Sequence, residues 1–179
     1  MIEDKDTNLA EKSQPGVNFN YFCTLKLIKE FMAQGLELLQ QRIGTVLNDT
    51  LSPAGSWLGF TLSSVSKGKA VATLTVRPEM CNPYGNIHGG MMSLVVDEII
   101  GFAVISLNAE NHYTSVTLNV DFLYAIKRDE TLRAEAEVIR FGKKIINVDV
   151  RVYHADNNIL LAKATSNLTA TSMPILQEQ

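Results

Sequence analysis

A long apolar segment, residues 88–107, constrains the fold of this chain more than any other feature. It contains no proline, and Gly101 is its only glycine beyond the first turn, so we predict a helix. Its apolar side chains do not keep to one stripe: they are Met91, Leu94, Val95, Ile99, Phe102, Ala103 and Ile105. Because a helix that is apolar nearly all round is normally surrounded by other structure, the rest of the chain must cover it.

The segments on either side of this helix are predicted to be strands. Two precede it, at residues 58–66 and 70–77, and four follow it, at 116–124, 132–138, 146–152 and 159–171. In most of them apolar side chains alternate with polar ones, which is typical of an antiparallel sheet with one dry face. We therefore predict an α+β fold in which the dry face of the sheet covers the helix.

The N-terminal part of the chain has a different character. Residues 1–20 are polar and are predicted to form a flexible tail. Apolar residues then recur at helical spacing, at Leu25, Ile28, Met32, Leu36, Leu39 and Ile43. The tract Thr50–Ser56, with Pro53 and Gly55, is predicted to break the chain. The expected organisation is a tail (1–20), a helical extension (21–56), a main domain (57–173) and a short tail (174–179).

The composition excludes several classes of protein. A net charge of −3 gives no electrostatic basis for a nucleic-acid partner. The two cysteines, Cys23 and Cys81, form neither a metal-type cluster nor a disulfide framework, and no metal or cofactor is predicted. Residues 1–20 do not show the basic and apolar regions of a signal peptide, and the sequence has no apolar run of the roughly 18 residues that a membrane span needs. A cytoplasmic protein without a membrane span is expected.

The junction between loop and helix, Asn82-Pro83-Tyr84-Gly85-Asn86-Ile87-His88-Gly89-Gly90, carries the strongest chemical information. The first backbone N–H groups of a helix have no partner within the helix. Paired glycines let a ligand approach that backbone closely, and the positive end of the helix dipole favours a developing oxyanion. Taken alone, the two glycines are equally compatible with a tight turn.

An acidic residue, Asp97, follows the His-Gly-Gly run within the same predicted helix. With this spacing the chain resembles hot-dog-fold thioesterases of the phenylacetate-pathway type, in the 4-hydroxybenzoyl-CoA thioesterase superfamily. The resemblance covers residues 59–171 and includes the stretches Ser115–Leu123 and Arg140–Lys144. It implies an antiparallel sheet wrapped around one long central helix, here with an extra N-terminal helix.

The resemblance also implies roles for individual residues. The Gly89 N–H would polarise the thioester carbonyl with help from Asn82, and Asp97 would be the general base or the nucleophile. Substrate contacts would come from Ser115, which holds the attacking water in some relatives, and from the His88-Gly89-Gly90 turn, whose histidine more often shapes the loop. Basic residues at a turn would meet the phosphates of coenzyme A; they are Arg140, Lys143 and Lys144.

Three of these assignments have alternatives. Glu98 competes with Asp97, which is favoured because Gly89, Ser93, Asp97 and Gly101 form a ridge of small residues on one helix face. By simple alternation Ser115 points away from the apolar face, so it reaches the site only if the strand is irregular there; otherwise it is a structural serine. A basic turn such as 140–144 is commonly just solvated.

The spacing of Gly89 and Asp97 places a further constraint on the site. They are eight residues apart, which corresponds to about 12 Å along a helix axis. One thioester carbon cannot contact both groups, so two subunits must share each site. We therefore predict a homodimer, or a dimer of dimers, that hydrolyses an acyl-CoA thioester without a cofactor.

Two other functions are compatible with the same fold. An enoyl-thioester hydratase would pair Asp97 with His88 as its histidine. A non-catalytic acyl-CoA sensor would bind the ligand without releasing thiol, but the N-terminal segment is too short and too uncharged to read DNA. The acyl group itself is not predicted by the sequence.

Overall fold

The computed structural model describes residues 34–109 and 111–171. In chain order its elements are α2 (Gly35–Gln40), β1 (Val46–Leu47), α3 (Pro53–Leu58), β2 (Phe60–Ser66), β3 (Lys69–Thr75), the 3-10 turn η1 (Pro78–Met80), α4 (Gly89–Ile105), β4 (His112–Phe122), β5 (Thr131–Phe141), β6 (Ile145–His154) and β7 (Leu160–Thr171).

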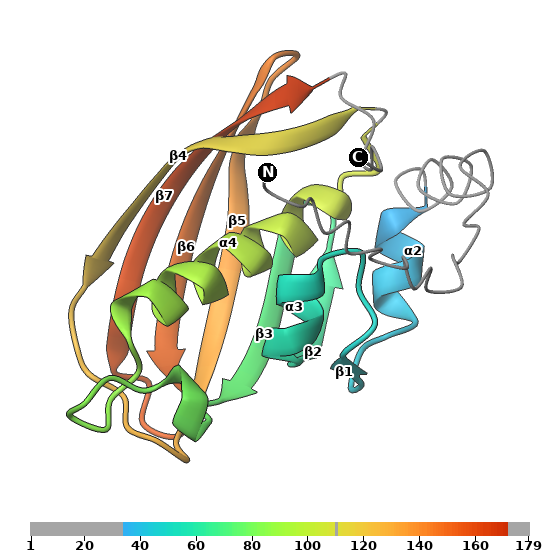
Figure 1. The fold of residues 1–179 in the computed structure, drawn as a ribbon. Coiled ribbons are helices and arrows are strands. Elements are labelled where there is room, and N and C mark those ends of the chain that lie inside the picture. The colour runs from blue at the N-terminus through green and yellow to red at the C-terminus, as the bar shows by residue number, and fades with distance from the viewer. Residues whose placement is uncertain (1–33, 110, 172–179) are drawn as a thin grey trace, which may run out of the picture.

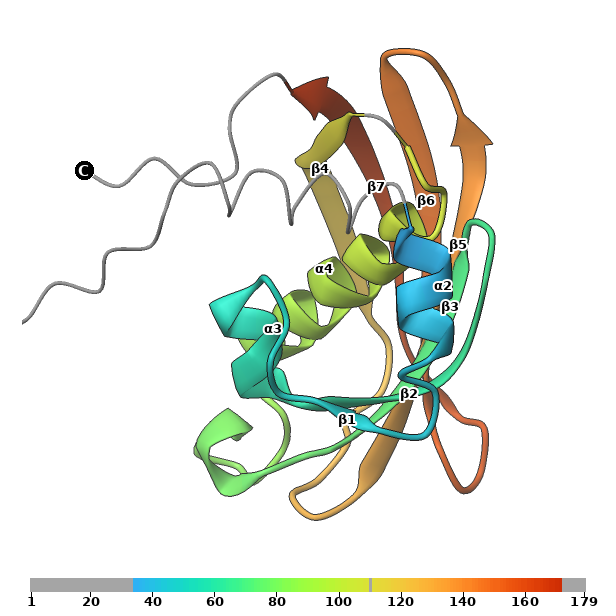
Figure 2. The ribbon, with the colours of Figure 1, turned by 90° about the vertical axis from the view of Figure 1, so that its right-hand side faces the viewer.

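One antiparallel sheet wraps around α4. The strand order is β1-β2-β3-β5-β6-β7-β4, so β1 and β4 form the two edges. The long helix crosses the concave face of the sheet, and the short helices α2 and α3 flank it (Figure 1). In the perpendicular view α4 lies between the sheet and α3 (Figure 2). This arrangement confirms the predicted α+β fold with one long helix covered by a sheet. None of the helices in the described part of the chain is long and apolar enough to cross a membrane.

The core lies between α4 and the sheet. The central residues of the helix, Val95, Val96, Ile99 and Ile100, are fully buried. They face inward-pointing strand residues, which are also fully buried; examples are Leu62, Ala72, Leu132, Ala134, Ile146, Val148, Val150 and Val152. Burying one such aliphatic side chain contributes roughly 1.5–3 kcal/mol. Helix and sheet therefore hold one another in register, and both ends of α4 are fixed relative to the strands.

The N-terminal region differs from the prediction. The helix expected to continue through Ile43 ends at Gln40, and Ile43 is 44% exposed. The predicted positions Leu25, Ile28 and Met32, together with the expected tails, lie outside the described residues.

The predicted break at 50–56 was wrong, because Pro53–Leu58 is the helix α3. Ser52 caps its start by accepting a hydrogen bond from the Gly55 N–H, and Pro53 occupies a first-turn position where a missing N–H costs nothing. Gly59, in the left-handed region at φ 67°, ends the helix. As a result Leu58, which we expected to begin a strand, belongs to α3, and β2 starts at Phe60.

Candidate active site

The loop before α4 is held by the side chain of Asn82. Its Oδ1 accepts hydrogen bonds from the backbone N–H groups of Tyr84 (2.9 Å) and Asn86 (3.2 Å). Two N–H donors can be satisfied only by the amide oxygen, which fixes the orientation of the amide group. Within the described residues the Nδ2 group of Asn82 makes no hydrogen bond, so it is a donor that a ligand can use.

The cap of α4 leaves the backbone N–H of Gly89 free. His88 precedes the helix, and its Nδ1 accepts a 3.0 Å hydrogen bond from the N–H of Gly90. Gly89 is the first helical residue, so its own N–H has no partner within the helix. His88 therefore caps this turn through its side chain. It also occupies the Gly90 N–H, which leaves the donor of Gly89 for a substrate.

These two donors share a cavity of about 330 Å³. Asn82 and Gly89 line it together with Asn86, Ile87, Met92, Phe122, Leu123, Tyr124, Ala125 and Leu161. A Cβ added at Gly89 would meet the ring of Phe122 at 3.5 Å, which is ordinary contact. Asp97 is absent from this cavity.

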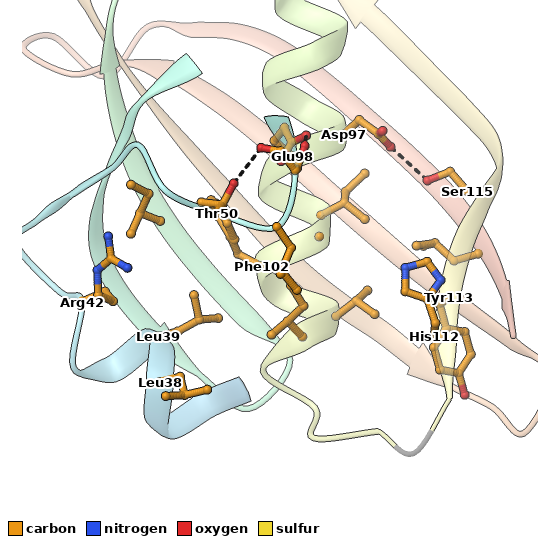
Figure 3. A pocket seen from close by; sticks show the side chains of 18 of the residues that line it. Leu38, Leu39, Arg42, Thr50, Asp97, Glu98, Phe102, His112, Tyr113 and Ser115 are labelled. Carbon is orange, nitrogen blue, oxygen red and sulfur yellow. Dashed lines mark hydrogen bonds between the residues drawn. The ribbon is translucent and has the colours of Figure 1, made fainter. Parts of the chain in front are cut away.

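The side chains of Asp97 on α4 and Ser115 on β4 contact each other. The Ser115 hydroxyl donates a 2.9 Å hydrogen bond to Oδ1 of Asp97 (Figure 3). The irregularity that Ser115 needs to face this side is present, because the pairing of β4 with β7 shifts between Ser115 and Thr117. One extra residue, Val116, forms a bulge there. Tyr113 and Ser115 before the bulge and Leu118 after it consequently share the helix-facing side.

The Asp97–Ser115 pair lies at one end of a larger cavity of about 590 Å³. Its wall comes from α4, from the start of β4 and from residues 38–52, and none of its lining residues lines the smaller cavity. Asp97 is exposed in the single chain. The two groups of predicted site residues therefore face different cavities.

Glu98 has a different environment from its neighbour. Its Oε1 accepts a 2.6 Å hydrogen bond from the hydroxyl of Ser52, so it ties the cap of α3 to α4. Burial raises the pKa of the Glu98 carboxyl above its ordinary value of 4.5; the Ser52 hydrogen bond opposes the rise and the nearby Asp97 charge adds to it. A carboxyl that already holds a helix cap is the weaker candidate for attack on a substrate.

Among the lining residues of the larger cavity that the sequence analysis missed, His112 is titratable. His112 begins β4 and lines the cavity beside Tyr113, and burial lowers the pKa of its imidazole. The sequence pattern around this isolated histidine does not indicate that it lines a cavity. The strand was predicted to begin at residue 116, and a prediction that it begins at His112 would have been needed. Within the described residues no group of His, Cys, Asp and Glu side chains could hold a metal ion.

The basic residues occupy two separate turns. Arg140, Lys143 and Lys144 belong to the β5–β6 hairpin, where the carbonyl of Lys144 accepts the N–H of Ala170. Because Ala170 pairs with Tyr113, this turn lies near the start of β4 and not near Gly89. The turn at Lys127 and Arg128 lies beside the Asn82 loop instead, since the Arg128 N–H donates to the Gly85 carbonyl.

A sheet wrapped around one long helix, with free donors at the helix start, is typical of hot-dog thioesterases. Comparisons with known proteins agree. Residues 84–160 match the model of the thioesterase superfamily. Acyl-coenzyme A thioesterase PaaI of Escherichia coli is 30% identical over 59% of this chain and 71% of its own length. Human acyl-coenzyme A thioesterase 13 is 27% identical over 58% of this chain and 74% of its own.

Among solved structures, a hypothetical thioesterase protein of Streptococcus pneumoniae, crystallised with coenzyme A, superposes with a TM-score of 0.60 and 27% identity. The match covers 63% of this chain and 86% of that protein. The chain belongs to the thioesterase superfamily, has the hot-dog fold, and is a thioester hydrolase.

Proposed function

We propose that this protein hydrolyses acyl-CoA thioesters at sites shared between two copies of the chain. One copy would supply the Gly89 N–H and the Asn82 Nδ2 group, and the other would supply Asp97 and Ser115. The observation that carries the proposal is the separation of these residues into two cavities without a common lining residue. The names of the relatives, and the coenzyme A in the pneumococcal structure, support the substrate class.

The first half-site suits an oxyanion. In the reaction the thioester carbonyl oxygen gains negative charge as its carbon becomes tetrahedral. The N–H of Gly89 and the amide of Asn82 are donors held in place by the helix cap and by the loop, so they need no rearrangement to stabilise that charge. Removing one such donor typically lowers kcat by about 10²–10³-fold.

The second half-site suits activation of water. Oδ1 of Asp97 is held by Ser115, which leaves Oδ2 to take a proton from water as the water oxygen attacks the carbonyl carbon. The C–S bond then breaks, and the proton returns to the CoA thiolate. Direct attack by the carboxylate, with a mixed anhydride that water later opens, uses the same geometry. Appearance of label in Asp97 after turnover in ¹⁸O-labelled water identifies the second route, because water that opens the anhydride at the Asp97 carbonyl leaves its oxygen in the carboxylate.

The edge strand β4 supports assembly with a second copy. It is an open edge of the sheet and exposes large apolar side chains at Val116 (61% exposed) and Phe122 (57% exposed). Exposed apolar edges of this kind favour pairing with another chain. Phe122 also contacts the position of Gly89, so a partner at this edge would lie beside the first half-site. A dimer of dimers stays a prediction.

Complementation between two inactive variants tests the shared site. Gly89→Pro removes the donor while keeping the helix, because proline suits the first helical position and His88 already has the extended backbone (ψ 139°) that precedes a proline. Asp97→Asn removes the base. Each variant alone should release little thiol. A mixture refolded together should regain about a quarter of wild-type activity, because half the dimers are mixed and each carries one intact site.

Gly89→Ala is the matched control, since it adds a side chain but keeps the N–H, and it should stay active in its own dimer. A monomeric wild-type protein with full turnover contradicts the proposal. So does a refolded mixture no more active than the mean of its two parents.

A further inference from the structure

The larger cavity, called the trough below, is longer than the hydrolytic step alone requires. Asp97 and Ser115 occupy one end, and the cavity continues past them along α4 toward Leu38 and Leu39 of α2 (Figure 3). We infer that this trough holds an unbranched aliphatic acyl chain of medium length, and that Gly101 is the residue that keeps room for it. The inference rests on the proposed function and adds the substrate class.

Gly101 forms the floor of the trough. It lies one helical turn beyond Asp97, about 6 Å further along the axis, and it lines the same cavity. A Cβ built at this position meets nothing within 4 Å. Glycine in a helix interior destabilises a helix by roughly 1 kcal/mol relative to alanine, and here no neighbouring atom would clash with an alanine side chain. What a side chain at this position would remove is empty space in the trough.

The side wall of the trough is fixed. Residues 38–52 form this wall, and Leu39 and Leu47 anchor it in the core at 5% and 2% exposed. Hydrogen bonds attach its two ends to α4 and to the residues just after it. The Ser52 hydroxyl donates to Glu98 (2.6 Å), and the N–H of Leu36, just before the wall, donates to Asn108 (2.9 Å). A wall held at both ends gives the trough a set length.

That length indicates the size of the acyl group. Asp97 and Ile105, the last cavity-lining residue of α4, are eight residues apart, or about 12 Å, which matches roughly eight to ten carbons of an extended chain with bonds of about 1.5 Å. An aromatic acyl group would fill only the part near Asp97. A second α4 helix packed on Gly101 is the competing occupant, but the cavity at this position is also lined by residues 38–52 and by the start of β4.

Graded substitutions test the inference with thiol release from acetyl- to hexadecanoyl-CoA. We expect a wild-type optimum near decanoyl-CoA. Gly101→Leu, a good helix former, should lower kcat/KM for decanoyl-CoA about 50-fold, since each displaced methylene costs roughly fourfold, and should leave acetyl-CoA within about twofold. Gly101→Ala should have a smaller effect in the same direction.

The opposite change should shift the optimum to longer chains. Leu38→Ala opens the far end of the trough, whereas Leu36→Ala alters the same helix at a residue that does not line it and serves as the control. Elution volume must stay unchanged in every variant. A Gly101→Leu protein that loses its partner, or loses activity equally with all chains, overturns the inference, as does a preference for aromatic acyl groups.

Calorimetric binding of CoA and decanoyl-CoA separates this inference from the proposed function. If the wild-type protein hydrolyses no acyl-CoA but binds decanoyl-CoA more tightly than CoA, and the Gly101→Leu variant lacks this preference, the inference about the trough is supported and the proposed function is contradicted. If thiol is released but the rate depends neither on chain length nor on these substitutions, the proposed function is supported and the inference about the trough is contradicted.

Discussion

The hydroxyl of Ser115 on β4 donates a 2.9 Å hydrogen bond to Oδ1 of Asp97 on α4. Both side chains are exposed in the single chain, so without this bond the carboxylate would be free to rotate between staggered positions. The bond fixes one carboxylate oxygen and directs the other toward the cavity. Ser115 is therefore best described as a positioning residue that acts through Asp97.

We predict that Ser115→Ala lowers kcat about 10–100-fold, because the carboxylate loses its fixed orientation. KM should change little, and Ser115→Thr, which keeps a hydroxyl, should restore most of the rate. Thiol release under saturating substrate measures both. Asn119→Ala is the matched control, since Asn119 is exposed on the same strand and lines neither cavity. Equal losses in the Asn119 and Ser115 variants would indicate damage to the strand and contradict the assigned role.

A second prediction separates the two neighbouring acids. Asp97→Asn keeps the size of the side chain and its bond from Ser115 but removes the base, so kcat should fall about 10³-fold. Glu98→Gln still accepts the Ser52 hydroxyl and should keep most of its activity. The measurement is thiol release by dimers of matched elution volume and circular dichroism. If Glu98→Gln is the inactive variant and Asp97→Asn turns over normally, the roles of the two residues are reversed.

The sequence predicted the parts of the fold that follow a regular period. The helix expected at 88–107 is α4 at Gly89–Ile105, and the four later strands were all expected. The Asn82–Gly90 junction was equally predictable from the sequence, because glycines, a cap residue and turn-forming residues determine the local backbone conformation. Its free donors are explained by contacts within nine residues.

The other half of the site depends on contacts between residues distant in sequence. The bulge at Val116, which turns Ser115 toward Asp97, is fixed by pairing with β7 about 50 residues later, and no local pattern indicates it. Pro53 and Gly55 were interpreted as helix breakers, although Ser52 before them makes a helix start. That helix is stabilised by Glu98, a residue 46 positions away from Ser52.

A third prediction concerns the basic turn of residues 140–144. If Lys143 and Lys144 contact the phosphates of coenzyme A, replacing both with glutamine should raise KM for an acyl-CoA severalfold at low salt and leave kcat unchanged. An acyl-N-acetylcysteamine thioester, which lacks the phosphates, should show no change. The matched pair Lys127→Gln and Arg128→Gln tests the turn beside the Asn82 loop. If KM for acyl-CoA rises in the Lys127 and Arg128 variants and not in the Lys143 and Lys144 variants, the phosphates bind at the turn beside the Asn82 loop.

The last prediction is a pH dependence of stability that arises from Glu98. Burial raises the pKa of this carboxyl in the folded protein above the ordinary value of 4.5, so the folded state holds its proton more tightly than the unfolded state. As pH rises from 4.5 through the folded pKa, the unfolded chain binds fewer protons, and the free energy of unfolding must fall. Because the side chain is only half-buried, we expect a loss below about 1 kcal/mol.

Glu98→Gln removes the titrating group and keeps an acceptor for Ser52, so its free energy of unfolding should exceed that of the wild type above this window and lose the corresponding slope. Urea unfolding of both proteins between pH 4.5 and pH 8 measures the difference. Glu98→Ala should be less stable at every pH, because it leaves the Ser52 cap without its partner. A wild-type protein whose stability relative to Glu98→Gln rises with pH would show that Glu98 is stabilised as a carboxylate, and that its charge has a partner in the assembled protein.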